Sequence, residues 1–167
     1  MFASYKRHNN ELYNNLVKLS RNKFFYQDLL IDDKTENRVL LLFFHFALIL
    51  HTIKGKKNEK TTQNIFDNIF QNIEYTIREL GHGDVYVNKK MKNLSRIFYD
   101  ILVFLDKNKS LVSDNNSSLL KKYFVSSNNE IPVRNDKLSD YFSKFQHFCF
   151  DLDSKNMLKG NFNFNYK

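Results

Sequence analysis

The chain has 167 residues and a formal net charge of +8, because 26 Lys and Arg residues outnumber 18 Asp and Glu residues. Its 42% apolar content is too high for a wholly disordered chain, and its single Cys excludes a disulfide framework or a Cys-based zinc site. The length predicts one domain, and the positive charge permits RNA, a ribosome surface or anionic lipid as a partner without choosing among them.

The first third of the chain predicts a short amphipathic helix followed by a long buried one. The first helix runs from about Asn10 to Arg21, with leucines at three- and four-residue spacing. An irregular aromatic stretch from Phe24 to Leu30 follows. Asp33-Lys-Thr-Glu36 fits a capping box that opens a helix reaching about Ile53. Because that helix is apolar almost all round, we expect it at the centre of the fold.

The longest apolar run predicts a buried helix and not a membrane span. It extends from Val39 to Leu50, and only His45 interrupts it. A helix over this run is about 18 Å long, whereas a bilayer core needs about 20 apolar residues. Residues 1–10 show no apolar or Arg- and Ser-rich targeting segment. We therefore expect a cytoplasmic protein, or a mitochondrial matrix protein whose presequence has been removed.

The middle of the chain predicts a helical hairpin. After a Lys-rich loop around Gly55, Thr61 or Thr62 fits the N-cap of a helix whose apolar residues recur at three- and four-residue steps up to Leu80. Gly81 can adopt the left-handed conformation that ends this helix, and Asp84 can cap the next. That next helix extends to about Leu105. Two long helices joined by so short a turn should pack as a hairpin.

The last third predicts two more helices and a tail. A polar segment precedes a short helix around residues 119–125, a loop holds Pro132, and a sixth helix covers residues 136–150. The tail, residues 151–167, alternates Asn with aromatic residues and is interpreted as extended or disordered. The fold class is therefore all-α: a single helical bundle of five to six helices within residues 1–150.

The sequence shows no catalytic or metal-binding signature. His45 and His51 are six residues apart and point to different faces of a helix, as do His147 and Cys149 at a spacing of two. His45 within an apolar helix is typical of a hydrogen-bonded core histidine, and Cys149 between two phenylalanines is typical of a small buried side chain. We expect no catalytic residue, metal or cofactor, and no enzyme activity.

Basic residues concentrate in two places. The loop cluster comprises Lys54, Lys56, Lys57 and Lys60. On the helix that follows the Gly81 turn, Lys89, Lys92 and Arg96 share one face by their spacing. The two interpretations are a solvated face in a Lys-rich chain and a dock for RNA phosphates or anionic headgroups.

The connection between the hairpin helices carries more charge than a turn needs. Residues 78–91 combine Arg78, Glu79, Asp84 and two lysines with two glycines. One interpretation is structural, with Arg78 or Glu79 pairing with Arg38 or a neighbouring helix. The other is a recognition surface for a partner protein.

The same residues resemble a known family. Arg78-Glu79-Leu80-Gly81-His82-Gly83-Asp84, followed by Val87-Asn88-Lys89-Lys90-Met91, is similar to the central motif of the ubiquinol–cytochrome c chaperone family, Arg-Glu-Met-Gly-x-Gly-Asp and then Val-Gly-Lys-Lys-Met. Phe98-Tyr99, Phe25-Tyr26 and the Asp33–His45 stretch also match. The resemblance covers about Leu12 to Leu105. The departures are Leu80, Asn88, Asp100 and Ile101, where the family has Met, Gly, Gly and Arg.

The resemblance implies an all-helical assembly factor for respiratory complex III, the cytochrome bc1 complex, in an alphaproteobacterium. It implies binding of newly made cytochrome b, with a small partner subunit and a ribosome or anionic membrane surface as further partners, a peripheral position at the inner membrane and no binding to DNA. The candidate residues for partner or client binding are Arg38, His45, Arg78, Glu79, Gly81, Gly83, Asp84, Lys89, Lys90, Met91 and Tyr99.

Two other functions stay open at this point. One is a basic RNA- or ribosome-binding module that acts through the lysine-rich faces. The other is an enzyme with an interhelical pocket lined by Arg38, His45, Glu79 and Asp84.

Overall fold

A computed structural model describes residues 10–54, 59–111, 118–125 and 133–166. Within these ranges every regular element is a helix, which confirms the all-α prediction. Six helices correspond to the six expected, and two short ones, α2 and α8, are additional. The elements are α1 (Glu11–Ser20), α2 (Lys23–Gln27), α3 (Thr35–Lys54), α4 (Glu59–Glu79), α5 (Asp84–Asn108), α6 (Ser118–Tyr123), α7 (Asn135–Asp151) and α8 (Ser154–Leu158).

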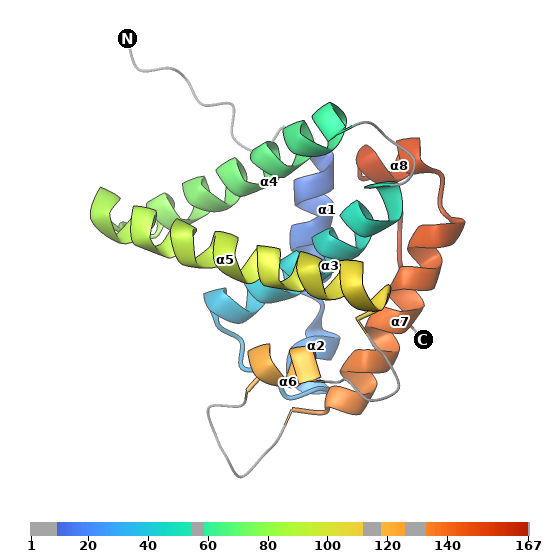
Figure 1. Ribbon diagram of the computed structural model, residues 1–167. Coiled ribbons are helices and arrows are strands. Elements are labelled where there is room, and N and C mark those ends of the chain that lie inside the picture. The colour runs from blue at the N-terminus through green and yellow to red at the C-terminus, as the bar shows by residue number, and fades with distance from the viewer. Residues whose placement is uncertain (1–9, 55–58, 112–117, 126–132, 167) are drawn as a thin grey trace.

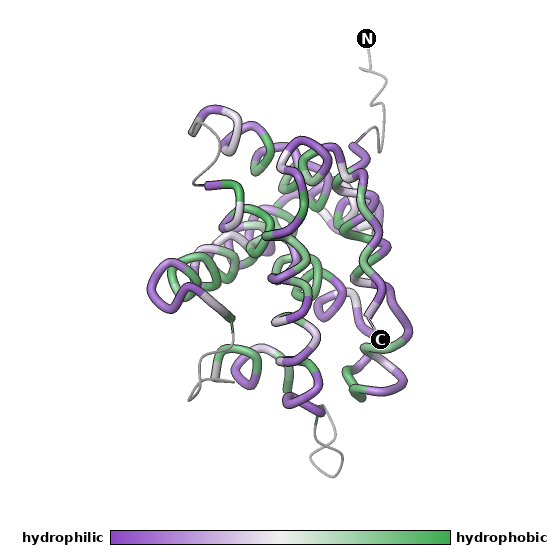
Figure 2. Tube along the Cα trace, turned by 90° about the vertical axis from the view of Figure 1, so that its right-hand side faces the viewer, coloured by the Kyte–Doolittle hydropathy of each residue, from purple (hydrophilic) through white to green (hydrophobic). Residues whose placement is uncertain are grey.

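Helix α3 is the centre of the fold, as predicted. Every residue from Leu40 to Leu50 is buried, and the helix packs against α1, α4, α5 and α7 (Figure 1). The surrounding helices are amphipathic, so their traces alternate between hydrophobic and hydrophilic residues (Figure 2). Among the described residues α3 alone is long and apolar enough to cross a membrane, yet 72% of its most apolar window is buried inside the fold. That burial is typical of a core helix.

The α4–α5 hairpin covers one side of α3 through phenylalanine side chains. Phe98 of α5 lies at the centre of this cluster. Its ring centroid is 5.1 Å from that of Phe43, 5.2 Å from that of Phe46 and 5.4 Å from that of Phe70. Offset and edge contacts at such distances add to the stability that burial alone provides. The predicted periodicity is confirmed along both helices, except that Leu80, the last member of the predicted series, is 56% exposed beyond the end of α4, and the polar Asn72 is buried with the series.

Helix α7 covers another side of α3 and packs against the buried His45 of α3. His45 is fully buried, its Nδ1 lies 2.6 Å from the Leu41 carbonyl oxygen, and its Nε2 lies 2.8 Å from the Tyr141 hydroxyl. Burial lowers the pKa of His45 to about 4, so the ring is neutral at pH 7. Both ring nitrogens therefore have partners, which is the core-histidine interpretation.

The segment after α7 folds back across α1 and α2. Asn15 of α1 donates hydrogen bonds of 2.8 Å from Nδ2 to the carbonyl oxygens of both Gly160 and Phe162. The Tyr166 hydroxyl donates to Asp140 of α7 at 2.6 Å, and its ring lies 4.7 Å from that of Phe24. Aromatic residues alternate with asparagines in this segment, so the aromatic side chains pack against the core while the asparagines face water.

Three predicted helix starts are wrong, each for a local reason. Helix α4 begins at Glu59, so Thr61 and Thr62 lie inside it. Helix α3 begins at Thr35, and the Asp33 carboxylate accepts a 2.7 Å hydrogen bond from Nε of Arg38. Helix α5 begins at Asp84 itself, with Gly83 in the N-cap position and without a side-chain cap. At Asp33 and at Asp84, a nearby arginine competes with the backbone amides of the helix for the carboxylate.

Replacing Gly160 by Ala should destabilise the fold more than the same change at Gly81. Both glycines have a positive φ, +69° and +86°, which costs roughly 1–2 kcal/mol for an alanine. A Cβ at Gly160 would also lie 2.6 Å from backbone atoms of Glu11 and Leu12, whereas one at Gly81 meets nothing within 4 Å. Urea unfolding of both variants tests this, and equal losses would contradict the tight packing of the tail on α1.

Acid should weaken the fold through His45. The unfolded histidine titrates near 6.5 and the folded one at about 4, so between these values only the unfolded chain takes up the proton. The free energy of unfolding should therefore fall by about 2 kcal/mol from pH 7 to pH 5 on this account. Urea unfolding should show a smaller fall in His45→Gln, whereas the surface variant His147→Gln should keep it. An unchanged fall in His45→Gln would contradict this assignment.

Candidate functional site

The turn between α4 and α5 is formed as its two glycines require. Gly81 has a φ of +86°, in the left-handed region predicted for it, and its amide donates to the Arg78 carbonyl oxygen at 3.0 Å. Gly83 leads into α5 with an extended backbone. The turn leaves Leu80 56% exposed and Val85 86% exposed, so apolar side chains as well as charges face water here.

Arg78 holds the two ends of the turn together. Its Nη2 lies 2.8 Å from Oε1 of Glu74 on the same helix, and its Nη1 forms an ion pair with Asp84, the first residue of α5. The hydrogen bonds that Arg78 donates to these two carboxylates raise its pKa, and the bond to Asp84 has the larger effect. The charge of the motif thus has a structural partner: Arg78 pairs with the neighbouring helix α5 through Asp84, which is one of the two pairings that the structural interpretation predicted.

A second ion pair joins the hairpin to the start of α3. Nζ of Lys90 lies 3.1 Å from Oε1 of Glu36, and both the Glu36 backbone and Lys90 lower the pKa of that carboxyl. Arg38, two residues after Glu36 on α3, pairs with Asp33, and this hydrogen bond lowers the pKa of the Asp33 carboxyl. The structure therefore brings Lys90 and Arg38 to the same end of α3, near which the hairpin turn also lies (Figure 1).

A small apolar hollow lies between α1, the start of α3 and the end of α4. We call it the Leu80 hollow; its volume is about 160 Å³, and the Tyr13 hydroxyl and Thr76 Oγ1, 3.0 Å apart, lie along it. Arg21 and Arg38 contribute its positive charges. Its apolar lining is Val17, Val39, Leu42, Ile73, Ile77 and Leu80.

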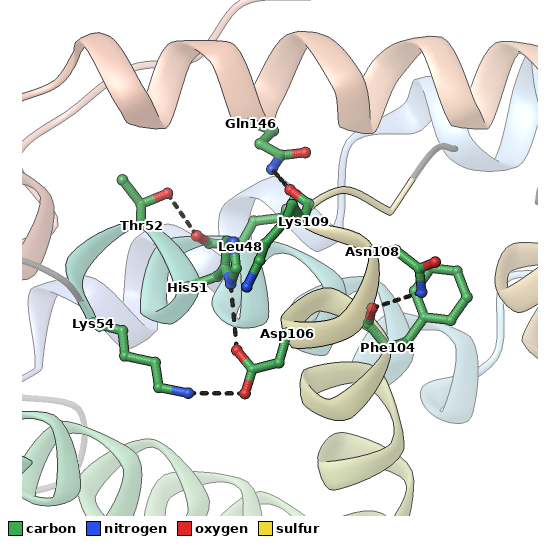
Figure 3. Close-up of polar contacts among 9 residues, drawn as sticks. All are labelled: Leu48, His51, Thr52, Lys54, Phe104, Asp106, Asn108, Lys109 and Gln146. Atoms are coloured by element: carbon green, nitrogen blue, oxygen red, sulfur yellow. Dashed lines mark hydrogen bonds and ion pairs between the residues drawn. The ribbon is translucent and has the colours of Figure 1, made fainter. Parts of the chain in front are cut away.

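A second hollow opens at the other end of the α3–α4 pair. We call it the Tyr99 hollow; its volume is about 340 Å³, and Leu50, Phe66, Leu102 and Tyr99 form its apolar part. Polar side chains from α3 and α5 meet at its edge (Figure 3).

At that edge two basic side chains of α3 lie close to the carboxylate of Asp106 on α5. Nζ of Lys54 is 2.8 Å from Oδ2 and Nδ1 of His51 is 3.7 Å from Oδ1 (Figure 3). The longer distance is beyond a hydrogen bond, and this buried nitrogen has no hydrogen-bond partner among the described residues. Burial lowers the pKa of His51, and the Lys54 bond lowers that of Asp106.

The basic residues predicted from the sequence fall into three groups. Lys54 is the last residue of α3 and pairs with Asp106, Lys60 is exposed within α4 and not in a loop, and Lys56 and Lys57 lie outside the described residues. Lys89, Lys92 and Arg96 are exposed along the outer face of α5, as their spacing predicts.

The candidate residues do not form a single site. Arg78, Glu79, Gly81, Gly83 and Asp84 lie at the turn, next to the Leu80 hollow through Leu80. Three other candidates lie elsewhere in the fold. Half-buried Met91 packs against the core, Tyr99 lies at the Tyr99 hollow, and His45 lies inside the core. Their spacing in the sequence did not predict this separation.

The interhelical pocket considered for an enzyme does not assemble as expected. Of its four proposed residues Arg38 lines the Leu80 hollow, whereas His45, Glu79 and Asp84 do not. Burial raises the pKa of the Cys149 thiol well above its ordinary value, which leaves it protonated at pH 7. In the part of the chain that the structure describes, no three His, Cys, Asp or Glu side chains gather closely enough to hold a metal ion.

Sequence reasoning missed several exposed apolar residues. Val85, Tyr86 and Val103 are 86%, 44% and 65% exposed, and all lie on α5. A signal was present, because these residues fall outside the buried series from Val87 to Leu105. Single exposed apolar residues are normal on a protein surface, so these three indicate a contact surface only together with other features beside them.

Reversing the charge of Lys90 should weaken the fold, whereas reversing that of Lys89 should not. Lys90→Glu breaks the pair with Glu36 and places like charges together, and it should lower the free energy of unfolding by up to about 1 kcal/mol. Lys89→Glu, one residue away on the exposed face, should change it by less than about 0.5 kcal/mol. Adding Glu36→Lys to Lys90→Glu should restore the loss; urea unfolding that shows no rescue would contradict the pairing.

Comparison with known proteins gives one solved structure and one family. The crystal structure of the Cbp3 homolog from Brucella abortus is 25% identical in sequence, covers 93% of this chain and 87% of its own, and superimposes with a TM-score of 0.72. No curated protein matches the chain. The model of the ubiquinol–cytochrome C chaperone family matches residues 27–164, well beyond the stretch up to Leu105 where the sequence motifs end. The chain belongs to the ubiquinol–cytochrome c chaperone family.

Proposed function

We propose that this chain assists assembly of the cytochrome bc1 complex by binding newly made cytochrome b. The observation that carries the proposal is the family match over residues 27–164, supported by the similarity in fold to the Brucella abortus Cbp3 homolog. On this proposal the chain is a binding protein and not a catalyst. The ribosome and a small partner subunit stay predictions from the resemblance.

We place client contact at the Leu80 hollow. Leu80 is 56% exposed beside a lining of aliphatic side chains, and it stands where the central motif of the family has Met, another apolar residue. An aliphatic side chain of a client helix that fills this hollow removes apolar surface from water on both partners. A hydrophobic helix laid against such a surface is a recurring mode of recognition, in which a few anchor residues provide most of the affinity.

Charged side chains beside the hollow keep its apolar lining compatible with water until an apolar client binds. Arg21 and Arg38 lie at the hollow, and Arg78 lies in the turn beside it with its carboxylate partners. These charged groups keep the surface soluble when no client is bound, so Leu80 can remain exposed without a large apolar patch around it.

Leu80→Asp should weaken capture of cytochrome b by about tenfold, because a carboxylate replaces an apolar contact. The assay immobilises the full chain and measures binding of detergent-solubilised peptides that span the transmembrane helices of cytochrome b. Phe150→Asp is the matched control, since Phe150 is 51% exposed on α7 and should tolerate the change without loss of binding.

A transmembrane peptide from an unrelated protein of similar hydropathy serves as the specificity control. Equal capture of both peptides would contradict a cytochrome b chaperone. Equal capture of the cytochrome b peptide by the native chain and by Leu80→Asp would contradict the placement of the client.

A further inference from the structure

The outer face of α5 presents one continuous stripe of exposed side chains, one of which, Tyr99, also contacts α4 with its ring 5.8 Å from that of Phe66. The residues of the stripe follow each other at steps of four and three along the helix, so they lie on one side, opposite the buried series. Over this span the helix rises about 27 Å. The α5 stripe consists of Val85, Lys89, Lys92, Arg96, Tyr99 and Val103, all exposed.

The positive charge of the stripe is only partly offset by the described residues, among which Arg96 helps to lower the pKa of Asp100 on the same helix. All three carboxylates of α5 are already paired, Asp84 with Arg78, Asp100 with Lys122 at 2.8 Å, and Asp106 with Lys54. Among the described residues Lys89, Lys92 and Arg96 form no ion pair with a carboxylate, and Arg96 donates only to Asn93, at 2.8 Å. Three exposed cations in a row that no described ion pair engages fit an anionic partner.

Apolar side chains flank these cations at both ends. Val85 is 86% exposed and Val103 is 65% exposed, and Tyr99, 54% exposed, lies between Val103 and Arg96. A phospholipid surface offers the matching chemistry, because its headgroup phosphates attract Lys and Arg while valine and tyrosine side chains enter the boundary below them. Tyrosine in particular is enriched at that boundary.

The shape of the stripe argues against the other anionic partners. Of its six residues only Tyr99 lines one of the two hollows, so the stripe is the outer side of a single helix and not a groove. A partner helix is usually held in a groove. RNA would use the cations, but it would leave the two valines without a role. A flat surface touches all six residues together.

We propose that the α5 stripe docks the protein on an anionic phospholipid surface, with Lys89, Lys92 and Arg96 at the headgroup phosphates and Val85 and Val103 entering the boundary. This goes beyond cytochrome b binding and does not depend on it. Each basic residue near such a surface strengthens binding about fivefold, so the three together should provide about a hundredfold.

Vesicle sedimentation with the full chain tests the proposal. The native chain should bind phosphatidylcholine vesicles that contain a third of phosphatidylglycerol, and it should not bind phosphatidylcholine alone. The combined variant Lys89→Gln, Lys92→Gln and Arg96→Gln should bind about a hundredfold more weakly, with unchanged thermal unfolding because the three side chains are exposed. A charge-matched control carries Lys18→Gln, Lys137→Gln and Lys155→Gln on α1, α7 and α8, and should lose less than about fivefold.

The apolar part has its own test. Val85→Ser with Val103→Ser should reduce the binding that persists at high salt, where the headgroup attraction is screened. Three results would overturn the proposal: no binding of the native chain to anionic vesicles, equal losses in the stripe variant and the charge-matched control, or stripe-dependent binding to a single-stranded RNA oligonucleotide without binding to the vesicles.

Discussion

The fold depends on the burial of α3 on every side. Eleven consecutive residues, Leu40–Leu50, are removed from water, and an isolated helix of this kind could not remain soluble. The one polar side chain among them, His45, is tolerated because the Leu41 carbonyl and the Tyr141 hydroxyl occupy both ring nitrogens. Without these partners its burial would cost about 1–3 kcal/mol. Helices α1, α4, α5 and α7 are placed by the need to cover this helix.

That constraint also explains why the surfaces proposed for binding lie on the hairpin. Helices α4 and α5 use one face to cover α3, and the phenylalanines around Phe98 fill that contact. Their remaining faces and the turn are left to water, held in place by Arg78 within the turn and by the Lys90–Glu36 pair to α3. Leu80 and the α5 stripe are therefore rigidly presented apolar and basic groups on a stable support.

The long elements followed from the sequence because hydrophobic periodicity decides them. The all-round apolar helix, the α4–α5 hairpin and the left-handed Gly81 were all predicted from local pattern. Helix starts were less predictable, because Asp33 and Asp84 pair with Arg38 and Arg78 and do not cap α3 and α5 as expected. The clustering of the motif residues in the turn was visible from their adjacency. The Lys90–Glu36 pair, 54 residues apart in sequence, and the two hollows depend on how whole helices pack, which no local pattern contains.

On the proposed function, this chain supports assembly of the cytochrome bc1 complex by binding newly made cytochrome b. The most direct measurement is the amount of cytochrome b and the ubiquinol–cytochrome c reductase activity in membranes of the encoding organism after deletion of the gene. Both should fall after the deletion, and the native gene should restore both. A gene with Leu80→Asp should restore them poorly, although the variant chain accumulates normally. Unchanged cytochrome b and reductase activity in the deletion strain would contradict the proposed function.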